Sequence, residues 1–363
     1  MLHAIPTLGG GGAERQLTYL AAEQVRSGHE VHVAVLCRRG PNFERLLRSG
    51  ARIHELGRKH GYDPRLGPDL VHLLRAVRPD LLQSWLLPAS LWGGACARLL
   101  STPWVVCSRA SQSHTYAKAH FQARLFDVCT RLADAVISNS ATGHRYWTER
   151  LPQRVRTYFI PNALPLDEID AAPPAHVPWI RERPLVLWIG RFEERSKNIY
   201  HQTDALLTVA ARTDAVIMMC GSGPEQQPIV DKIASAGLQE RVRVVEHRDD
   251  VWSLMKVASV LLSASYSEGN PNVVLEAMAC RCPVVVSDIG AHRELLDDST
   301  ALFAAPTDIA ALASAIISSL ADPSSAAARA ARARPVIERR ALPTIEKAYD
   351  AAYLAILGDR GDF

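Results

Sequence analysis

Two glutamates eight positions apart, Glu268 and Glu276, lie in a stretch whose residue types could hold a polar ligand. The stretch runs from Val260 to Val286 and predicts an apolar strand, a polar loop, a helix and a second apolar strand. Pro271 can open the helix, because the N–H that proline lacks has no partner at the first helical position. In a parallel sheet, such a loop and helix start lie at the carboxyl edge of the strands, where these sheets bind ligands.

The loop before this helix is rich in hydrogen-bond donors. The backbone N–H groups of Gly269, Asn270 and Asn272, helped by the helix dipole, suit a sugar hydroxyl or a phosphate. A single Glu near a helix start is more commonly just a residue that the dipole favours. Here the residue types are defined at nine places within one strand–helix–strand unit: Ser265, Glu268, Gly269, Pro271, Glu276, Ala277, Met278, Ala279 and Pro283.

This pattern resembles the donor-site signature of the family 4 glycosyltransferases, in which seven residues separate two glutamates (EX7E). The resemblance implies the GT-B architecture, an α/β protein with two Rossmann-like domains that face each other across a cleft. It also implies transfer of a sugar from a nucleotide-sugar with retention of configuration. In that family Glu268 would hold the donor sugar as one of the catalytic residues, and Glu276 would accept hydrogen bonds from the ribose hydroxyls.

Two cations follow the predicted strand Leu185–Ile189, in the segment Gly190–Asn198 with the sequence GRFEERSKN. Arg191 and Lys197 could converge on a diphosphate, the first through its planar fork and the second as a point charge. The alternative is a charged surface turn. The segment resembles the GR(F/L)xxxKN pattern of the same family, which implies that both cations act as catalytic residues on the leaving diphosphate.

The resemblance assigns further donor-site positions. Gly221 begins a glycine turn, GSGPE, at the end of the predicted strand Ala215–Cys220, and His247–Asp249 would border the nucleotide base. The predicted donor-binding residues are Gly11, Gly12, Arg191, Lys197, Gly221, Gly269, Asn270, Pro271, Asn272, Val273 and Glu276. No DxD triplet occurs in the chain, so we expect no metal ligand set and no cofactor besides the nucleotide-sugar co-substrate.

The N-terminal part repeats the strand–helix–strand pattern. Leu2–Ile5 predicts a strand, Gly9–Gly12 a glycine loop, and Ala13–Ser27 a helix. The spacing is not GxGxxG with a later acidic residue, so a nicotinamide cofactor is not indicated. The sequence GGGAERQL resembles the first loop of the acceptor-side domain of these enzymes. The segments Ser138–Ser140 and Ile160–Asn162 resemble the last strands of the same domain.

One position departs from the family pattern. Many relatives place a histidine just after the fourth strand, whereas this chain carries Gln83, Trp85 and Pro88 there. His114, from a neighbouring loop, could take that place, although an exposed loop histidine is the more common case. We therefore assign Arg15, Arg109 and His114 to the acceptor side.

The strand and helix patterns divide the chain of 363 residues into two halves. We predict an N-terminal acceptor-side domain over 1–165 and a donor-binding domain over 179–340. The segment 166–178 is Pro-rich and without periodicity, which is typical of a linker. Residues 341–363 include an amphipathic pattern over Ile345–Leu357, and the resemblance implies that this last helix crosses back to the first domain.

Composition places the chain among soluble globular proteins. Apolar residues make up 48% and charged residues 22%, and no run reaches the roughly 20 apolar residues that span a bilayer. The seven cysteines are scattered and odd in number, which favours reduced thiols over a disulfide framework. The N-terminus lacks the pattern of a signal peptide, so we expect a cytoplasmic protein.

Charge is unevenly distributed. Residues 1–166 carry 21 Lys and Arg against 11 Asp and Glu, a balance of +10, whereas the remainder carries 20 against 27, a balance of −7. Part of the excess clusters around Arg45, Arg48, Arg52, Arg58 and Lys59. Such a cluster is usually a solvated face, but it could also bind an anionic membrane or a phosphate-linked acceptor. Nothing indicates a nucleic-acid partner.

These observations favour a peripheral membrane glycosyltransferase that adds a sugar to a saccharide or lipid-linked saccharide during synthesis of a surface polysaccharide or glycolipid. One alternative is a GT-B nucleotide-sugar epimerase. Another is a nucleotide-sugar binding protein without catalysis, which the missing histidine and Arg281 suggest. Arg281 stands where relatives have Gly, and if its φ is positive it costs about 1 kcal/mol.

Overall fold

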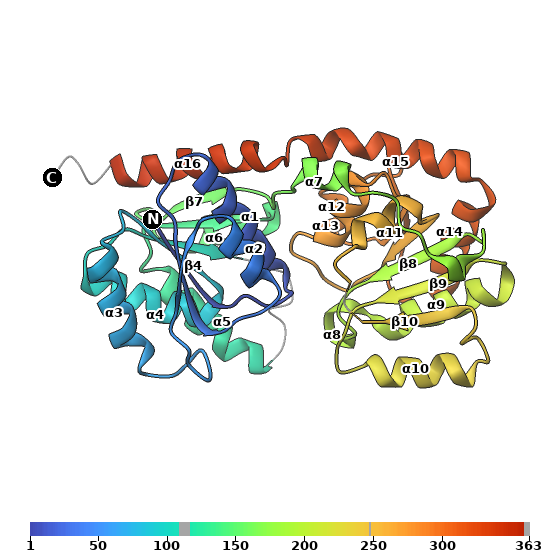
Figure 1. Ribbon diagram of the computed structural model, residues 1–363, viewed down its shortest axis with the longest axis horizontal. Coiled ribbons are helices and arrows are strands. Elements are labelled where there is room, and N and C mark those ends of the chain that lie inside the picture. Colours follow the sequence, from blue (N-terminus) through green and yellow to red (C-terminus); the bar gives the residue numbers. More distant parts are fainter. Residues whose placement is uncertain (109–116, 247, 359–363) are drawn as a thin grey trace. The chain divides into compact units, whose positions relative to one another are not determined.

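The computed structural model describes residues 1–108, 117–246 and 248–358 of the chain (Figure 1). It forms two compact units. Unit 1 consists of Met1–Ala163 and Arg340–Phe363, and unit 2 consists of Leu164–Arg339. The last helix therefore belongs with the N-terminal part of the chain, next to helix α1, and the long middle segment forms a body of its own.

Unit 1 is built from parallel strands with helical crossovers. Its described residues hold a seven-stranded sheet in the order β3-β2-β1-β4-β5-β6-β7, in which every neighbouring pair is parallel. The strands are β1 (Leu2–Thr7), β2 (His32–Arg38), β3 (Arg52–Glu55), β4 (Leu82–Trp85), β5 (Trp104–Ser108), β6 (Ala135–Ser138) and β7 (Arg156–Phe159). The helices are α1 (Gly12–Arg26), α2 (Asn42–Arg48), α3 (Leu66–Val77), α4 (Leu86–Leu99), α5 (Ala117–Thr130), α6 (Ala141–Arg150) and α16 (Leu342–Gly358).

Unit 2 follows the same pattern. Its described residues hold a six-stranded parallel sheet in the order β10-β9-β8-β11-β12-β13. The strands are β8 (Leu185–Ile189), β9 (Val216–Cys220), β10 (Val242–Val245), β11 (Val260–Ser263), β12 (Val284–Ser287) and β13 (Leu302–Ala304). The helices are α7 (Leu166–Ala171), a 3-10 turn (Pro178–Ile180), α8 (Glu194–Lys197), α9 (Ile199–Arg212), α10 (Gln226–Ser235), α11 (Val251–Val257), α12 (Asn272–Ala279), α13 (Gly290–Arg293), α14 (Ile309–Ala321) and α15 (Pro323–Glu338).

Each sheet is buried on both faces, which explains why its strands are almost continuously apolar in sequence. In unit 1 one cluster packs α1 and α16 against the sheet, through residues such as Leu17 and Tyr349. A second cluster packs α3 and α4 on the other face, through Leu70 and Ala89. Unit 2 has the same two layers of helices around β8 and β11. The predicted α/β class with two Rossmann-like bodies is confirmed.

Both sheets reverse their strand order at one place. In unit 1 the reversal lies between β1 and β4, and in unit 2 it lies between β8 and β11. Loops that leave two such strands diverge to opposite faces of the sheet and leave a crevice at its carboxyl edge, where α/β proteins bind ligands. The loops after β8 and β11 are Gly190–Glu193 and Ala264–Pro271, which hold the predicted donor-site cation Arg191 and the predicted carboxylate Glu268.

The predicted linker over 166–178 differs from the structure. Half of it forms helix α7, whose Ile169 is fully buried in the core of unit 2. Arg334 forms an ion pair with Asp170 at 2.7 Å, and the Lys256 ammonium donates to the carbonyl oxygens of Asp170 and Ala172. The segment is therefore a structured part of unit 2. The chain passes between the units at Ala163/Leu164 and at Arg339/Arg340.

No single described helix is long and apolar enough to cross a membrane. Helices α14 and α15 meet at an angle of 102°, and this bent pair reaches the required length and composition only when both are counted together.

Candidate active site

The residues that could do chemistry in unit 2 come from two loops that leave neighbouring strands. Strand β8 pairs with β11, with Trp188 opposite Leu262, so the loops that follow them start side by side at the carboxyl edge of the sheet. The first loop leads into α8, which ends at Lys197, and the second contains Glu268. Residues 71 positions apart are thus brought together by the strand order alone.

Lys197 and Glu268 form the central ion pair of the site. The Lys197 ammonium donates to the Glu268 carboxylate at 2.5 Å, and the Ser265 hydroxyl donates to the same oxygen at 2.7 Å. The Lys197 side chain is 29% exposed and the Glu268 side chain 13%, so both groups remain within reach of a ligand. Burial by itself would raise the pKa of Glu268, but the charge of Lys197 and the two hydrogen bonds lower it on balance.

Asn198 fixes the cation loop. Its backbone has φ of +54°, a left-handed conformation that asparagine tolerates better than most residues, and it both ends α8 and precedes α9. The buried side chain donates to the carbonyl oxygen of Ala264 at 2.9 Å and to that of Pro306 at 2.6 Å. The end of β11 is thereby tied directly to the residue after Lys197. The sequence analysis named Asn198 only as the last residue of the Gly190–Asn198 motif. The Lys–Asn pair that ends this motif was the signal that could have identified it.

His292 lies behind the ion pair, fully buried in α13, the short helix that follows strand β12. Its Nδ1 donates to the Ser287 carbonyl oxygen at 2.8 Å, so Nδ1 carries the proton in the neutral ring. The Ser287 hydroxyl donates to the Ser265 carbonyl oxygen at 2.7 Å, which links His292 to the loop of Glu268. Burial lowers the pKa of His292 despite the nearby Glu268. The sequence prediction did not assign this residue, because a buried histidine has no signature of its own.

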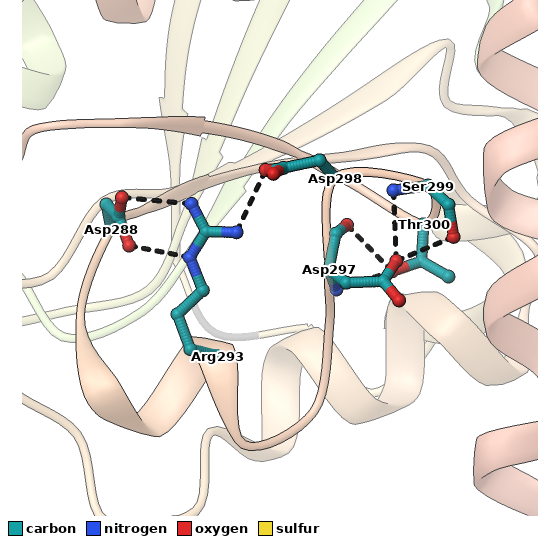
Figure 2. A network of polar contacts seen from close by, with 6 residues as sticks. All are labelled: Asp288, Arg293, Asp297, Asp298, Ser299 and Thr300. Atoms are coloured by element: carbon teal, nitrogen blue, oxygen red, sulfur yellow. Dashed lines mark hydrogen bonds and ion pairs between the residues drawn. The ribbon is translucent and has the colours of Figure 1, made fainter.

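A polar network holds the segment that carries His292 (Figure 2). The Arg293 guanidinium forms two hydrogen bonds with Asp288, at 2.7 and 2.9 Å, and a third with Asp298 at 2.9 Å. Beside it, the Asp297 carboxylate accepts from the backbone N–H of Ser299 at 2.9 Å and from the hydroxyl of Thr300 at 3.0 Å. These bonds fix both ends of the turn that follows β12, so α13 presents His292 inward.

Glu276 lies inside α12 and is 1% exposed. The Trp252 indole N–H donates to its carboxylate at 3.2 Å, which ties α12 to α11. The helix begins at Asn272, with Pro271 as the residue before it rather than as its first helical residue. The prediction for Pro271 was therefore wrong by one position. Asn270 and Pro271 are buried, while Gly269, Asn272 and Val273 are partly exposed at the start of the helix.

Gly221 is required by a close approach of two loops. Its φ is +147°, and a Cβ there would collide with the carbonyl oxygen of Gly190. Its N–H donates to Val245 and the Gly190 N–H donates to Cys220, so the two strand ends lie against each other. Arg191, which follows Gly190 in the sequence, is exposed at this edge. The loop after β9 therefore shapes the backbone that carries Arg191.

The predicted residues of unit 1 belong to the other body. Gly11 precedes the first residue of α1, Gly12, and Arg15 lies in the first turn of that helix. In place of the expected histidine, Gln83 and Trp85 point into the core, where Gln83 donates to Cys107 at 2.7 Å and Trp85 donates to His3 at 3.3 Å. Neither replaces a ligand-facing histidine. Arg109, His114 and His247 lie outside the described residues.

Comparisons with known proteins agree with this arrangement. A model of the family "Glycosyltransferase Family 4" matches residues 10–168, and a model described as "Glycosyl transferases group 1" matches residues 183–322. Similar proteins include the glycogen synthase of Mycobacterium tuberculosis, with 28% identity over 80% of this chain and 68% of the relative. Another is the 2-deoxystreptamine N-acetyl-D-glucosaminyltransferase of Streptomyces fradiae, with 25% identity over 95% of this chain and 91% of the relative.

Solved structures with the same fold were also found. HepE of Anabaena, crystallised with UDP and glucose, matches with a TM-score of 0.82 and 19% identity over 98% of this chain and 99% of that one. The two family models follow one another along the chain, the first mainly over unit 1 and the second within unit 2. The chain belongs to the family 4 glycosyltransferases of GT-B fold.

Proposed function

We propose that this glycosyltransferase takes its sugar from a UDP- or GDP-sugar and transfers it, with retention of configuration, to a saccharide or lipid-linked saccharide. The observation that carries the proposal is the Lys197–Glu268 pair between the loops of β8 and β11. It places a cation and an ionised carboxylate at the sheet edge where such folds bind nucleotides. The negative diphosphate of a nucleotide-sugar needs a cation, and the hydroxyl groups of its sugar need a hydrogen-bond acceptor such as a carboxylate.

The roles follow from where charge develops during transfer. The bond between the anomeric carbon and the diphosphate oxygen breaks, while the acceptor hydroxyl bonds to that carbon and gives up its proton to the leaving diphosphate. Arg191 and Lys197 stabilise the negative charge that gathers on the leaving diphosphate. Ionised Glu268 and the amides after it hold the donor sugar, and Glu276 accepts from the ribose hydroxyls. The two cations make a bound metal at this site unnecessary.

The relatives support a nucleotide-sugar donor and a glycan acceptor. HepE of Anabaena was crystallised with UDP and with UDP-glucose. The relatives in Mycobacterium leprae and Rhizobium meliloti are a phosphatidyl-myo-inositol mannosyltransferase and a lipopolysaccharide core glycosyltransferase. Because these proteins are transferases, transfer is favoured over the epimerase and the non-catalytic alternatives. The phosphatidyl-myo-inositol and the lipopolysaccharide in these two names support the lipid-linked acceptor of the proposal, and the glycogen synthase supports the saccharide acceptor.

A cytoplasmic position at the inner face of the membrane is part of the proposal. The net positive charge of residues 1–166 supports it. Two members of the basic cluster contribute less than expected, because Arg52 pairs with Glu30 at 2.6 Å and Arg58 pairs with Asp69 at 2.5 Å. Co-sedimentation of the protein with anionic but not with neutral vesicles is the expected result.

The test of the proposed function is calorimetric titration of the protein with UDP-, GDP- and ADP-sugars in the presence of a chelator. We expect one class of nucleotide-sugar to bind, followed by slow release of free nucleotide. The variant Glu276→Ala should bind the same donor more weakly, while Glu240→Ala, an exposed residue of unit 2, should not differ from the wild type. Binding that requires added metal, or that survives Glu276→Ala unchanged, would contradict the site assignment.

A further inference from the structure

A group of three side chains in unit 1 has no part in the glycosyltransferase site. His29 lies between α1 and β2, and Glu346 and Asp350 lie four residues apart on α16. Residues with this spacing share one face of a helix, and α16 packs against α1. The segment before β2 and the last helix, which are more than 300 residues apart in sequence, therefore bring one imidazole and two carboxylates together.

The distances suit a metal ion. His29 Nε2 lies 3.0 Å from the Asp350 carboxylate and 3.7 Å from Glu346 Oε1. One ligand atom from each residue lies within 4.8 Å of the other two. Zinc binds His nitrogen and carboxylate oxygen at about 2.0–2.2 Å, which places neighbouring ligand atoms roughly 3–3.6 Å apart. Small side-chain movements would bring all three atoms to these distances.

Glu346 gives an independent indication. Its side chain is only 4% exposed, and its Oε1 atom accepts no hydrogen bond from any residue that the structure describes. This oxygen faces His29. A buried carboxylate oxygen without a donor is costly, and a cation beside this oxygen would relieve that cost.

The group opens into a cavity of about 250 Å³. His29 and Asp350 line it together with Met1 and Leu81, which precede strands β1 and β4. The cavity therefore lies at the amino ends of the strands, the edge opposite to the one at which α/β sheets bind their substrates. A ligand in this cavity would be separate from the carboxyl edge of unit 1.

We propose that His29, Glu346 and Asp350 form a binding site for one Zn²⁺ ion that fastens α16 to the rest of unit 1. One imidazole and two carboxylates are a donor set that zinc accepts, whereas Mg²⁺ and Ca²⁺ prefer oxygen ligands alone. Three protein ligands leave one position of a tetrahedron for water, on the side of the cavity. The site stabilises the helix that ends the chain and takes no part in glycosyl transfer.

The experiment uses the full chain after treatment with a chelator and measures ZnCl₂ binding by calorimetry and melting temperature. The wild type should bind one equivalent at this site and melt at a higher temperature with zinc. Glu346→Gln keeps the size of the side chain but removes the charge, and should bind zinc at least tenfold more weakly. Asp80→Asn is the matched control, because Asp80 lines the same cavity outside the three ligands. It should bind zinc like the wild type.

Two further measurements test whether Glu346→Gln is folded and whether the metal binds at cysteines instead. Without metal, Glu346→Gln should melt close to the wild type, which shows that it folds, because glutamine keeps the size of the side chain. Co²⁺ in place of zinc should give a visible absorption without the near-ultraviolet charge-transfer band of a thiolate, which excludes binding at Cys280 and Cys282. Equal zinc affinity in wild type and Glu346→Gln, a thiolate band, or no zinc uptake by the folded wild type would each overturn the proposal.

Discussion

The strands at the order reversal use polar residues in different ways in the two sheets. In unit 2 the strands at the order reversal, β8 and β11, lead to charged residues at their ends, and Lys197 pairs there with a partly accessible Glu268. In unit 1 the corresponding strands, β1 and β4, carry neutral polar residues within the strands. His3 and Gln83 are fully buried and face the helices that cover the sheet. The same topology therefore supplies a charged site in one unit and a polar core in the other.

The polar core of unit 1 is a connected network. His3 Nε2 bonds to Gln24 at 2.8 Å, and the Tyr353 hydroxyl on α16 donates to the Gln83 side-chain oxygen. Gln24 also donates to Tyr353 at 3.4 Å. Buried networks of this kind stabilise one arrangement of elements when every member has a partner. The difference teaches that β4, after which many relatives place a histidine, serves in this chain to hold the last helix.

The largest expected effect would come from the charged site. Lys197→Ala should reduce nucleotide-sugar turnover about 100- to 1,000-fold, because it removes a charge that stabilises the leaving diphosphate. The change also leaves Glu268 without its cation, so weaker donor binding should accompany the loss. Turnover is measured as release of free nucleotide with the donor identified by calorimetry.

Lys232→Ala is the matched control for this prediction. Lys232 pairs with Asp204 at 2.7 Å in the same unit and has a similar exposed fraction, 35% against 29% for Lys197. Exposed pairs contribute about 0.2–1 kcal/mol, so this variant should keep its turnover. Equal losses in both variants would mean that Lys197 acts only on stability.

The next effect tests the polar core through pH. Burial lowers the pKa of His3 from 6.5 to about 4, so the folded protein keeps this ring neutral while the unfolded chain takes up a proton. The stability from a neutral His3 is complete above pH 6.5 and is lost as pH falls from 6.5 to about 4. The loss amounts to about 3 kcal/mol. His3→Gln should flatten the pH dependence of unfolding of unit 1 in this window, and an unchanged pH profile would contradict the buried neutral state.

Much of the fold could be predicted from the sequence. Short apolar runs that end in glycine or polar loops predict parallel strands, because a strand buried on both faces must be apolar throughout. The predicted strands Leu2–Ile5, Leu185–Ile189 and Ala215–Cys220 agree with β1, β8 and β9 to within two residues at each end. Loops after such strands meet at one sheet edge, so placing Lys197 near Glu268 required only the order of the strands.

Other features depend on contacts that no local pattern contains. The segment 166–178 shows no apolar periodicity, because a single fully buried side chain, Ile169, anchors its short helix. An ion pair between Asp170 and Arg334, which is distant in sequence, also holds this helix. His292 becomes part of the site only through Ser287 and Ser265. Gln83 is hydrogen-bonded to a residue 270 positions away. Partners of this kind are set by tertiary packing, which sequence spacing does not reveal.

A smaller effect would test the link between β4 and α16. Tyr353→Phe removes the hydroxyl that donates to Gln83 and leaves a buried amide oxygen without that donor. A buried polar group that loses its partner costs about 1–3 kcal/mol. The melting temperature of unit 1 should fall, whereas donor binding should stay unchanged. Tyr62→Phe, at a side chain exposed by 43%, is the control and should change stability by less than about 0.5 kcal/mol. A similar decrease in both variants would show that the network contributes nothing.

The smallest expected effect compares two arginines in the same conformation. Arg281 follows α12 in unit 2 with φ of +56°, and Arg78 follows α3 in unit 1 with φ of +49°. Both side chains are exposed, and both backbones are in the region that glycine enters without strain. Arg281→Gly and Arg78→Gly should therefore each stabilise the protein by about 1 kcal/mol or less, measured as a rise in melting temperature.

Turnover separates the two arginines. Arg281 stands in the donor-binding unit, five residues after Glu276, so its unusual side chain suggested a protein that has lost catalysis. If the positive φ is only local strain, Arg281→Gly gains stability and keeps the turnover of the wild type, as Arg78→Gly does. If the arginine contributes charge to the donor site, Arg281→Gly loses turnover while it gains stability, and Arg78→Gly does not. Because the Arg281 side chain is exposed at the far end of α12 from Asn272, we expect the first result.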